Sequence, residues 1–120
     1  MTIRFVKAHG AGNDFLLSYD AAGLPEAQYP ELARAICDRH RGVGADGLIL
    51  FTGLASIRLF NSDGSEAELS GNGTRCAAAL LIADARAAGE LSIETRAGPK
   101  QLRLLERRGQ RYVLEMRMGR

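Results

Sequence analysis

Residues 74 to 88 read Thr-Arg-Cys-Ala-Ala-Ala-Leu-Leu-Ile-Ala-Asp-Ala-Arg-Ala-Ala, and this stretch decides the fold of the 120-residue chain. It consists mainly of strong helix formers, and Gly89 follows at a position typical of a helix C-terminal cap. No polar residue lies between Cys76 and Ala83, so this helix is predicted to be buried nearly all round. A short chain can bury such a helix only by wrapping strands around it.

Strand-like runs lie on both sides of this helix. A second helix is predicted from Pro30 to about His40, because Pro30 suits a first helical turn and apolar residues follow it on one stripe. The predicted class is α+β, with a mostly antiparallel or mixed sheet curled into a barrel around a central buried helix. The predicted strands cover residues 2–8, 15–19, 48–51, 56–60, 91–96, 101–106 and 111–116.

The composition is that of a soluble globular domain. Apolar residues make up 46% and charged residues 25%, which excludes a disordered, collagen-like or coiled-coil chain. We expect residues 1–120 to form a single domain. No apolar run approaches about 18 residues and no secretory signal opens the chain, so we expect a cytoplasmic protein without membrane contact. Two cysteines without CxxC spacing and two histidines predict no metal site.

The net charge of +2 is unevenly distributed, since residues 101–120 hold six arginines against two glutamates. A basic C-terminal segment can indicate nucleic-acid binding. Here the arginines alternate with apolar residues, as on the solvated face of strands, and we therefore expect no nucleic-acid partner. The apolar residues are Leu102, Leu104, Leu105, Val113, Leu114 and Met116.

A glycine-rich loop at residues 42–47 matches the GxGxxG pattern of dinucleotide-binding proteins. That pattern requires a strand before it and a helix after it, whereas here a predicted helix precedes and a predicted strand follows. A loop in which Asp46 bonds nearby amides is the favoured interpretation. No P-loop sequence is present, and we predict no cofactor.

A second glycine cluster, Ser70-Gly71-Asn72-Gly73, lies immediately before the buried helix. Free backbone amides and the helix dipole at such a terminus suit an anion such as a carboxylate. Simple capping by Ser70 or Asn72 is the interpretation that the residues alone favour. Asn13 and Asn61 lie in two other glycine turns, where each alone would close an Asx-turn. Together, the three asparagines could converge on a zwitterion such as an amino acid.

Four ordered motifs resemble those of the diaminopimelate epimerase family, isomerases of bacterial lysine and peptidoglycan precursor synthesis. The resemblance spans nearly all of this chain and corresponds to the N-terminal half of a family in which two similar halves face each other. The motifs are Phe5-x-Lys7-x-His9-Gly10-x-Gly12-Asn13-Asp14-Phe15, Arg39-x-x-Gly42-x-Gly44-x-Asp46-Gly47, Phe60-Asn61-x-Asp63-Gly64-Ser65-x-Ala67 and Gly71-Asn72-Gly73-Thr74-Arg75-Cys76.

The resemblance implies epimerisation of LL- to meso-diaminopimelate without pyridoxal phosphate or any other cofactor. One group removes the α-proton and another delivers a proton to the opposite face. The family resemblance implies a cysteine pair for this work, one per half, each beside a helix N-terminus. Asn13, Asn61, Gly71 and Asn72 match substrate-contacting positions. The resemblance further implies a C-terminal half, in cis or in trans, and a possible homodimer.

Ser70 stands where the family motif has its first catalytic cysteine. A hydroxyl ionises far above the pKa of about 8.5 of a thiol, so a serine supplies almost no anion at neutral pH. Cys76 is no substitute, because six helical residues place it about 9 Å further along the axis. We predict Cys76 to be a buried core residue.

Two alternatives to the epimerase interpretation stay open. One is a non-catalytic half that binds diaminopimelate or serves assembly, suggested by Ser70 and by the missing opposing half. The other is an isomerase of the phenazine-biosynthesis type, which resembles this family in fold. The Gly71–Cys76 and Phe60–Ser65 motifs favour the cysteine-dependent branch over the phenazine type.

Overall fold

The computed structural model describes residues 3–117, which form two β-sheets and two α-helices in an α+β arrangement. Thr2, where the first strand was predicted to begin, lies outside the described residues. A five-stranded sheet has the order β1–β2–β3–β4–β5, with β2 and β3 parallel and its other neighbours antiparallel. Its strands are β1 (Val6–Gly10), β2 (Asn13–Ser18), β3 (Gly47–Phe51), β4 (Ile57–Asn61) and β5 (Glu66–Ala67).

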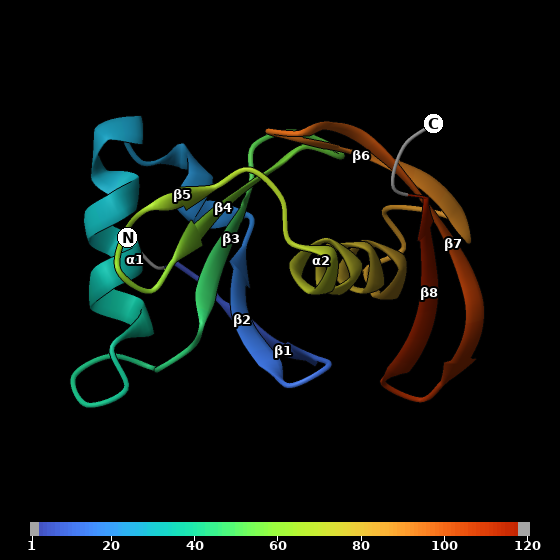
Figure 1. Ribbon diagram of the computed structural model, residues 1–120, viewed down its shortest axis with the longest axis horizontal. Coiled ribbons are helices and arrows are strands. Elements are labelled where there is room, and N and C mark those ends of the chain that lie inside the picture. The colour runs from blue at the N-terminus through green and yellow to red at the C-terminus, as the bar shows by residue number, and fades with distance from the viewer. Residues whose placement is uncertain (1–2, 118–120) are drawn as a thin grey trace.

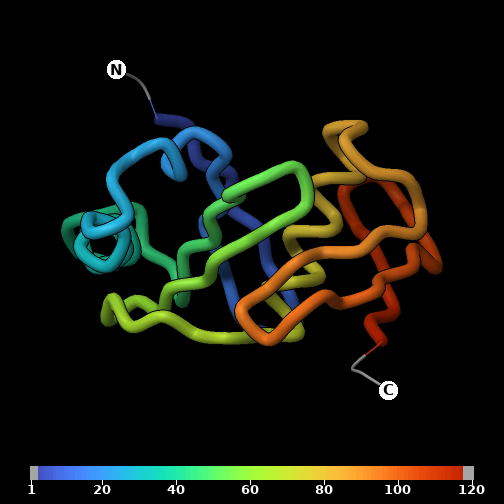
Figure 2. Tube along the Cα trace, turned by 90° about the horizontal axis from the view of Figure 1, so that it is seen from above, coloured from blue at the N-terminus to red at the C-terminus, as the bar shows by residue number. Residues whose placement is uncertain are grey.

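The second sheet is an antiparallel meander of three strands, β6 (Glu90–Thr95), β7 (Gly98–Arg108) and β8 (Arg111–Arg117). Helix α2 (Gly71–Ala83) lies between the two sheets, and α1 (Tyr29–Cys37) covers the other face of the five-stranded sheet (Figure 1). Two short 3-10 turns, η1 (Asp20–Gly23) and η2 (Glu26–Gln28), lead into α1. Figure 2 shows the β6–β7 turn, in orange, beside the segment that leads into α2.

The expected closed barrel is not found among residues 3–117. The two sheets meet through one isolated bridge between Ser56 and Glu94, where the Glu94 amide also donates to the Ala55 carbonyl at 2.8 Å. On the opposite side, β1 and β8 both contact α2 instead of pairing with each other. Within the described residues, these two strand edges are therefore not hydrogen-bonded to each other, and the sheets do not close into a barrel.

Helix α2 is shorter than predicted and less deeply buried. It ends at Ala83, because Ala85 adopts a left-handed φ of 57° and the Arg86 amide donates back to the Leu81 carbonyl at 2.8 Å. This is the pattern of a Schellman cap, formed by an alanine instead of the predicted Gly89. Burial nearly all round was also wrong, since Ala79, Leu80 and Ile82 are only half-buried and Ala83 is exposed.

The arginine-rich strands largely follow the predicted alternation. Leu102, Leu114 and Met116 are buried in the same cluster as α2, while Arg103 and Arg117 are exposed. Leu105 and Val113 depart from the prediction, since they are 54% and 37% exposed, and the β7–β8 pairing is irregular between Leu104 and Glu106 beside them.

A cluster of charged side chains, Arg58, Glu66 and Arg96, links the two sheets on the side where the Ser56–Glu94 bridge joins them. Glu66 of β5 accepts from Arg58 at 2.8 Å and from Arg96, next to β6, at 2.9 Å. These two cations lower the pKa of Glu66 from 4.5 to about 2, with the hydrogen bond from Arg58 as the largest cause. The stabilisation is therefore complete above pH 4.5 and is lost as the pH falls through about 2.

Glu66→Gln is expected to lower the free energy of unfolding by about 2 kcal/mol at pH 7, since it removes charge-assisted hydrogen bonds. The difference from the unaltered protein should shrink between pH 5 and pH 2, and urea unfolding at several pH values measures it. Glu106→Gln is the matched control, because among residues 3–117 Glu106 forms an ion pair with the exposed Arg108 alone. A Glu66→Gln deficit that is the same at pH 2 and pH 7 would contradict this assignment.

Candidate active site

The site is built at the N-terminus of α2, where Ser70 is the capping residue. Its hydroxyl oxygen accepts from the Gly73 amide at 3.0 Å, and its backbone carbonyl accepts from the Thr74 amide at 2.9 Å. The predicted capping by Ser70 is thus confirmed. Within residues 3–117, the amides of Gly71 and Asn72 have no hydrogen-bond acceptor. These two N–H groups, at the positive end of the helix dipole, suit a carboxylate.

The β1–β2 turn packs directly against this helix terminus. Ala11 and Gly12 take left-handed φ values of 49° and 90°, which brings the chain round to Asn13 at the start of β2. A Cβ on Gly10 would lie 3.5 Å from the Asn72 carbonyl oxygen and 3.3 Å from the Cys76 sulfur, so the turn lies close to α2. The Asn72 side-chain amide donates to the Asn13 side-chain carbonyl at 2.9 Å.

Asn61 lies at the same edge of the five-stranded sheet, but its side chain is hydrogen-bonded within its own turn. Because β2 and β3 begin at this edge and β4 ends there, Asn61 pairs with Gly47 in the sheet register. Its side chain donates to the Ser65 hydroxyl at 3.0 Å and closes the turn. Within the described residues no hydrogen bond joins it to Asn13 or Asn72. The structure therefore links two of the three asparagines, and a shared ligand for all three stays a prediction.

A charged cluster behind Asn13 was missed by sequence reasoning. The buried Asp14 carboxylate accepts from Arg39 at 2.8 Å and lies 3.2 Å from the Lys7 ammonium. The hydrogen bonds from Arg39 are the largest cause of a pKa for Asp14 far below its ordinary value. Lys7 lies in β1, Asp14 in β2 and Arg39 in the loop after α1, so only their presence within the family-like motifs could have drawn attention to them.

The loop at residues 42–47 follows α1 and leads into β3, as predicted, which is the reverse of the order in a dinucleotide site. Asp46 accepts from the Asp14 backbone amide at 3.0 Å, a partner in β2 instead of in its own loop. Cys76 is buried, as predicted, and burial raises the pKa of its thiol to about 11. Such a thiol is a poor proton acceptor at neutral pH.

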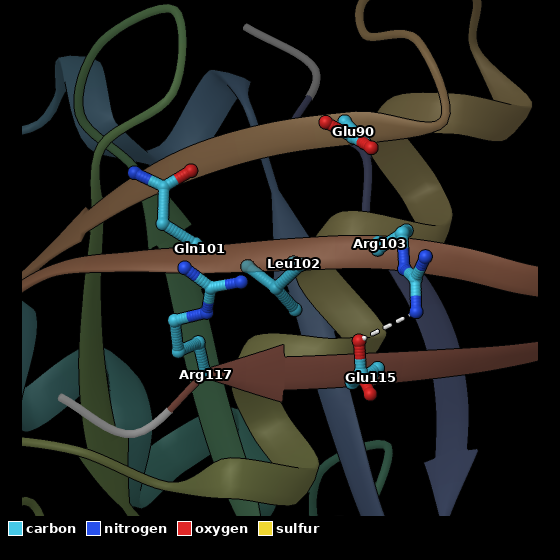
Figure 3. Close-up of a pocket in the computed structure, with 6 residues that line it drawn as sticks. All are labelled: Glu90, Gln101, Leu102, Arg103, Glu115 and Arg117. Atoms are coloured by element: carbon cyan, nitrogen blue, oxygen red, sulfur yellow. Dashed lines mark hydrogen bonds and ion pairs between the residues drawn. The ribbon is translucent and has the colours of Figure 1, made fainter. Parts of the chain in front are cut away.

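A hollow of about 350 Å³ lies elsewhere, over the three-stranded sheet (Figure 3). Arg103 and Glu115 form an ion pair of 3.1 Å across it, and none of the predicted site residues lines it. Among residues 3–117, no group of three or more His, Cys, Asp or Glu side chains is placed to hold a metal ion. The same residues include no helix long and apolar enough to cross a membrane.

The sequence comparisons with known proteins agree on one family. The sequence model described as Diaminopimelate epimerase matches residues 5–120. The diaminopimelate epimerase of Pelotomaculum thermopropionicum is 43% identical, with 98% of this chain and 44% of that protein aligned. That of Halothermothrix orenii is 39% identical, with 100% of this chain and 44% of that protein aligned. The chain therefore belongs to the diaminopimelate epimerase family, and it spans less than half the length of these relatives.

Solved structures of other proteins are similar to this chain in fold. A phenazine biosynthesis protein from Bacillus anthracis superimposes with a TM-score of 0.65, covering 95% of this chain and 38% of that one. The two sequences are 23% identical. At this identity the likeness concerns the fold alone.

Proposed function

We propose that this chain is the N-terminal, substrate-binding half of a cofactor-independent epimerase that interconverts LL- and meso-diaminopimelate. The observation that carries the proposal is the meeting of the β1–β2 turn with the N-terminus of α2. There, Asn13 and Asn72 are joined side chain to side chain, next to the two amides of Gly71 and Asn72 that lack acceptors. An amino acid's α-carboxylate fits those amides, and the asparagines supply neutral polar contacts for its ammonium group.

In this proposal the chain works as one domain, with α2 as its central helix, opposite a second half supplied in cis or in trans. Removing a proton from one face of the α-carbon and returning one to the other requires groups on both faces. The N-terminus of α2 offers one face only. Developing negative charge on the substrate carboxylate would be stabilised by the same helix amides. Asn61, Gly71 and Asn72 are proposed as substrate contacts together with Asn13.

Ser70 supports a second candidate, a half that binds diaminopimelate without turning it over. Its hydroxyl is engaged as the helix cap and ionises far above neutral pH, so it is a poor base. A phenazine-type isomerase is supported less well, because the relatives named diaminopimelate epimerase are 39% and 43% identical, against 23% for the phenazine protein.

Two measurements on the longest form of the protein that contains this chain separate these candidates. The first is exchange of the α-hydrogen of meso-diaminopimelate in deuterated water, followed by proton NMR. The second is a calorimetric titration with the same compound. Binding together with exchange supports the epimerase, and binding without exchange supports the non-catalytic half. The absence of both would refute the proposed function.

A further inference from the structure

Asn13 is held from behind by the carboxylate of Asp46, which the proposed function does not use. The Asp14 backbone amide donates to Asp46 Oδ2 at 3.0 Å, and the Asn13 side-chain nitrogen lies 3.3 Å from the same oxygen. The Asp46 amide donates back to Asp14 Oδ1 at 3.0 Å. Asp46 and the start of β2 are thus bound to each other in both directions.

Arg39 binds the carboxylates of both Asp14 and Asp46 and so fixes how they are oriented toward each other. One of its guanidinium nitrogens donates to Asp14 Oδ1 at 2.8 Å and to Asp46 Oδ1 at 3.2 Å. Lys7 adds a second cation, 3.2 Å from Asp14, and donates to the Gly44 carbonyl at 2.7 Å. The carboxylates of Asp14 and Asp46 therefore face the cations of Arg39 and Lys7, and these side chains come from β1, β2 and the loop between α1 and β3. Asp46 presents its Oδ2 to Asn13 in a fixed position.

An ionised carboxylate only accepts hydrogen bonds, whereas a side-chain amide has a donor end and an acceptor end. The end of Asn13 that faces Asp46 must therefore be its NH₂ group. Its carbonyl oxygen then faces Asn72, which has to donate through its own NH₂, as the 2.9 Å contact requires. The Asn72 carbonyl oxygen is left as an acceptor with no protein partner among residues 3–117.

We propose that Asp46 is a positioning residue, whose carboxylate sets the amide orientation of Asn13 and, through it, that of Asn72. The Asn72 carbonyl oxygen is thereby directed to accept from the ammonium group of an α-amino acid ligand. The second statement rests on the proposed function. The first concerns the protein without ligand and can be tested separately.

The orientation can be read in the unaltered 120-residue chain by NMR. Because the Asn13 side chain and the Asp14 backbone amide donate to the same oxygen, a nuclear Overhauser cross-peak is expected between their N–H protons. Asp46→Asn should weaken or remove this cross-peak, because an amide can face Asn13 with either end. Asp38→Asn is the matched control, since Asp38 lies in the same loop and, among the residues that the structure describes, accepts from the His40 and Arg41 amides alone. Absence of the cross-peak in the unaltered chain would overturn the inference.

Binding tests whether the effect passes through Asn13. Asp46→Asn is expected to weaken meso-diaminopimelate binding about tenfold, the equivalent of one lost hydrogen bond, and Asp38→Asn should leave the Kd unchanged. In an Asn13→Ala background, Asp46→Asn should have no further effect. An equal loss in both backgrounds would refute the positioning role. If the unaltered chain binds no meso-diaminopimelate, the proposed function fails, while the cross-peak still decides the orientation.

Discussion

Ser70→Cys is expected to raise the rate of α-hydrogen exchange on meso-diaminopimelate by about 100- to 10,000-fold, the usual contribution of a positioned general base. The variant places a thiol at the N-cap of α2, where Ser70 now accepts from the Gly73 amide. The helix dipole favours a thiolate there, so its pKa should fall below about 8.5. Exchange should rise with pH through that pKa, because the thiolate is the form that accepts the proton.

The control for this prediction is Ser92→Cys. Ser92 is exposed in β6 of the three-stranded sheet and is not adjacent to any proposed substrate contact, so a thiol there should leave exchange at the level of the unaltered protein. Both variants are compared in the longest form of the protein that contains this chain. Equal rates for Ser70→Cys and Ser92→Cys would contradict a catalytic role for position 70.

Leu81→Ala is expected to lower the free energy of unfolding by about 2–5 kcal/mol, the range for removing a large buried aliphatic side chain. Leu81 is 1% exposed and belongs to the cluster that joins α2 to strands of both sheets, including Leu17, Ile49, Ile93 and Leu114. A cavity there removes contacts from both sheets at once. Since α2 also carries Ser70 and Asn72 at its other end, loosening the helix should weaken ligand binding as well.

Urea unfolding followed by circular dichroism measures this loss. Leu54→Ala is the matched control, because Leu54 is 93% exposed and the same substitution there should change stability by less than about 0.5 kcal/mol. If the two variants unfold at the same urea concentration, α2 is not the element that holds the two sheets together.

The sequence predicts the elements well wherever the signal is local. Alternation and glycine turns locate the seven predicted strands, and Ser70 before a run of helix formers marks the start of α2. The end of α2 could not be predicted in this way. Asp84 accepts from the Tyr19 hydroxyl at 3.0 Å and the Arg86 guanidinium lies over the Tyr19 ring, contacts that span more than 60 residues. These tertiary contacts accompany the helix end six residues before Gly89.

Only part of the site could be predicted, because only part of it is formed by residues that are close in sequence. Ser70, Gly71 and Asn72 are adjacent in sequence, and their role at the helix terminus can be predicted from capping rules. The support behind Asn13 could not, because Asp14 meets Arg39 and Asp46 across 25 and 32 residues. Asn61 is the opposite case, because its side chain is hydrogen-bonded to a residue close in sequence, Ser65, four residues away.

The most direct test of the proposed site is the response of individual backbone amides to ligand. ¹⁵N-labelled chain is titrated with meso-diaminopimelate, and chemical shifts are followed for every assigned residue. We expect the largest changes at Gly71 and Asn72, whose amides lack acceptors, and smaller ones at Asn13. Unchanged Gly71 and Asn72 amides at saturating ligand, or changes confined to the hollow around Arg103 and Arg117, would contradict the account.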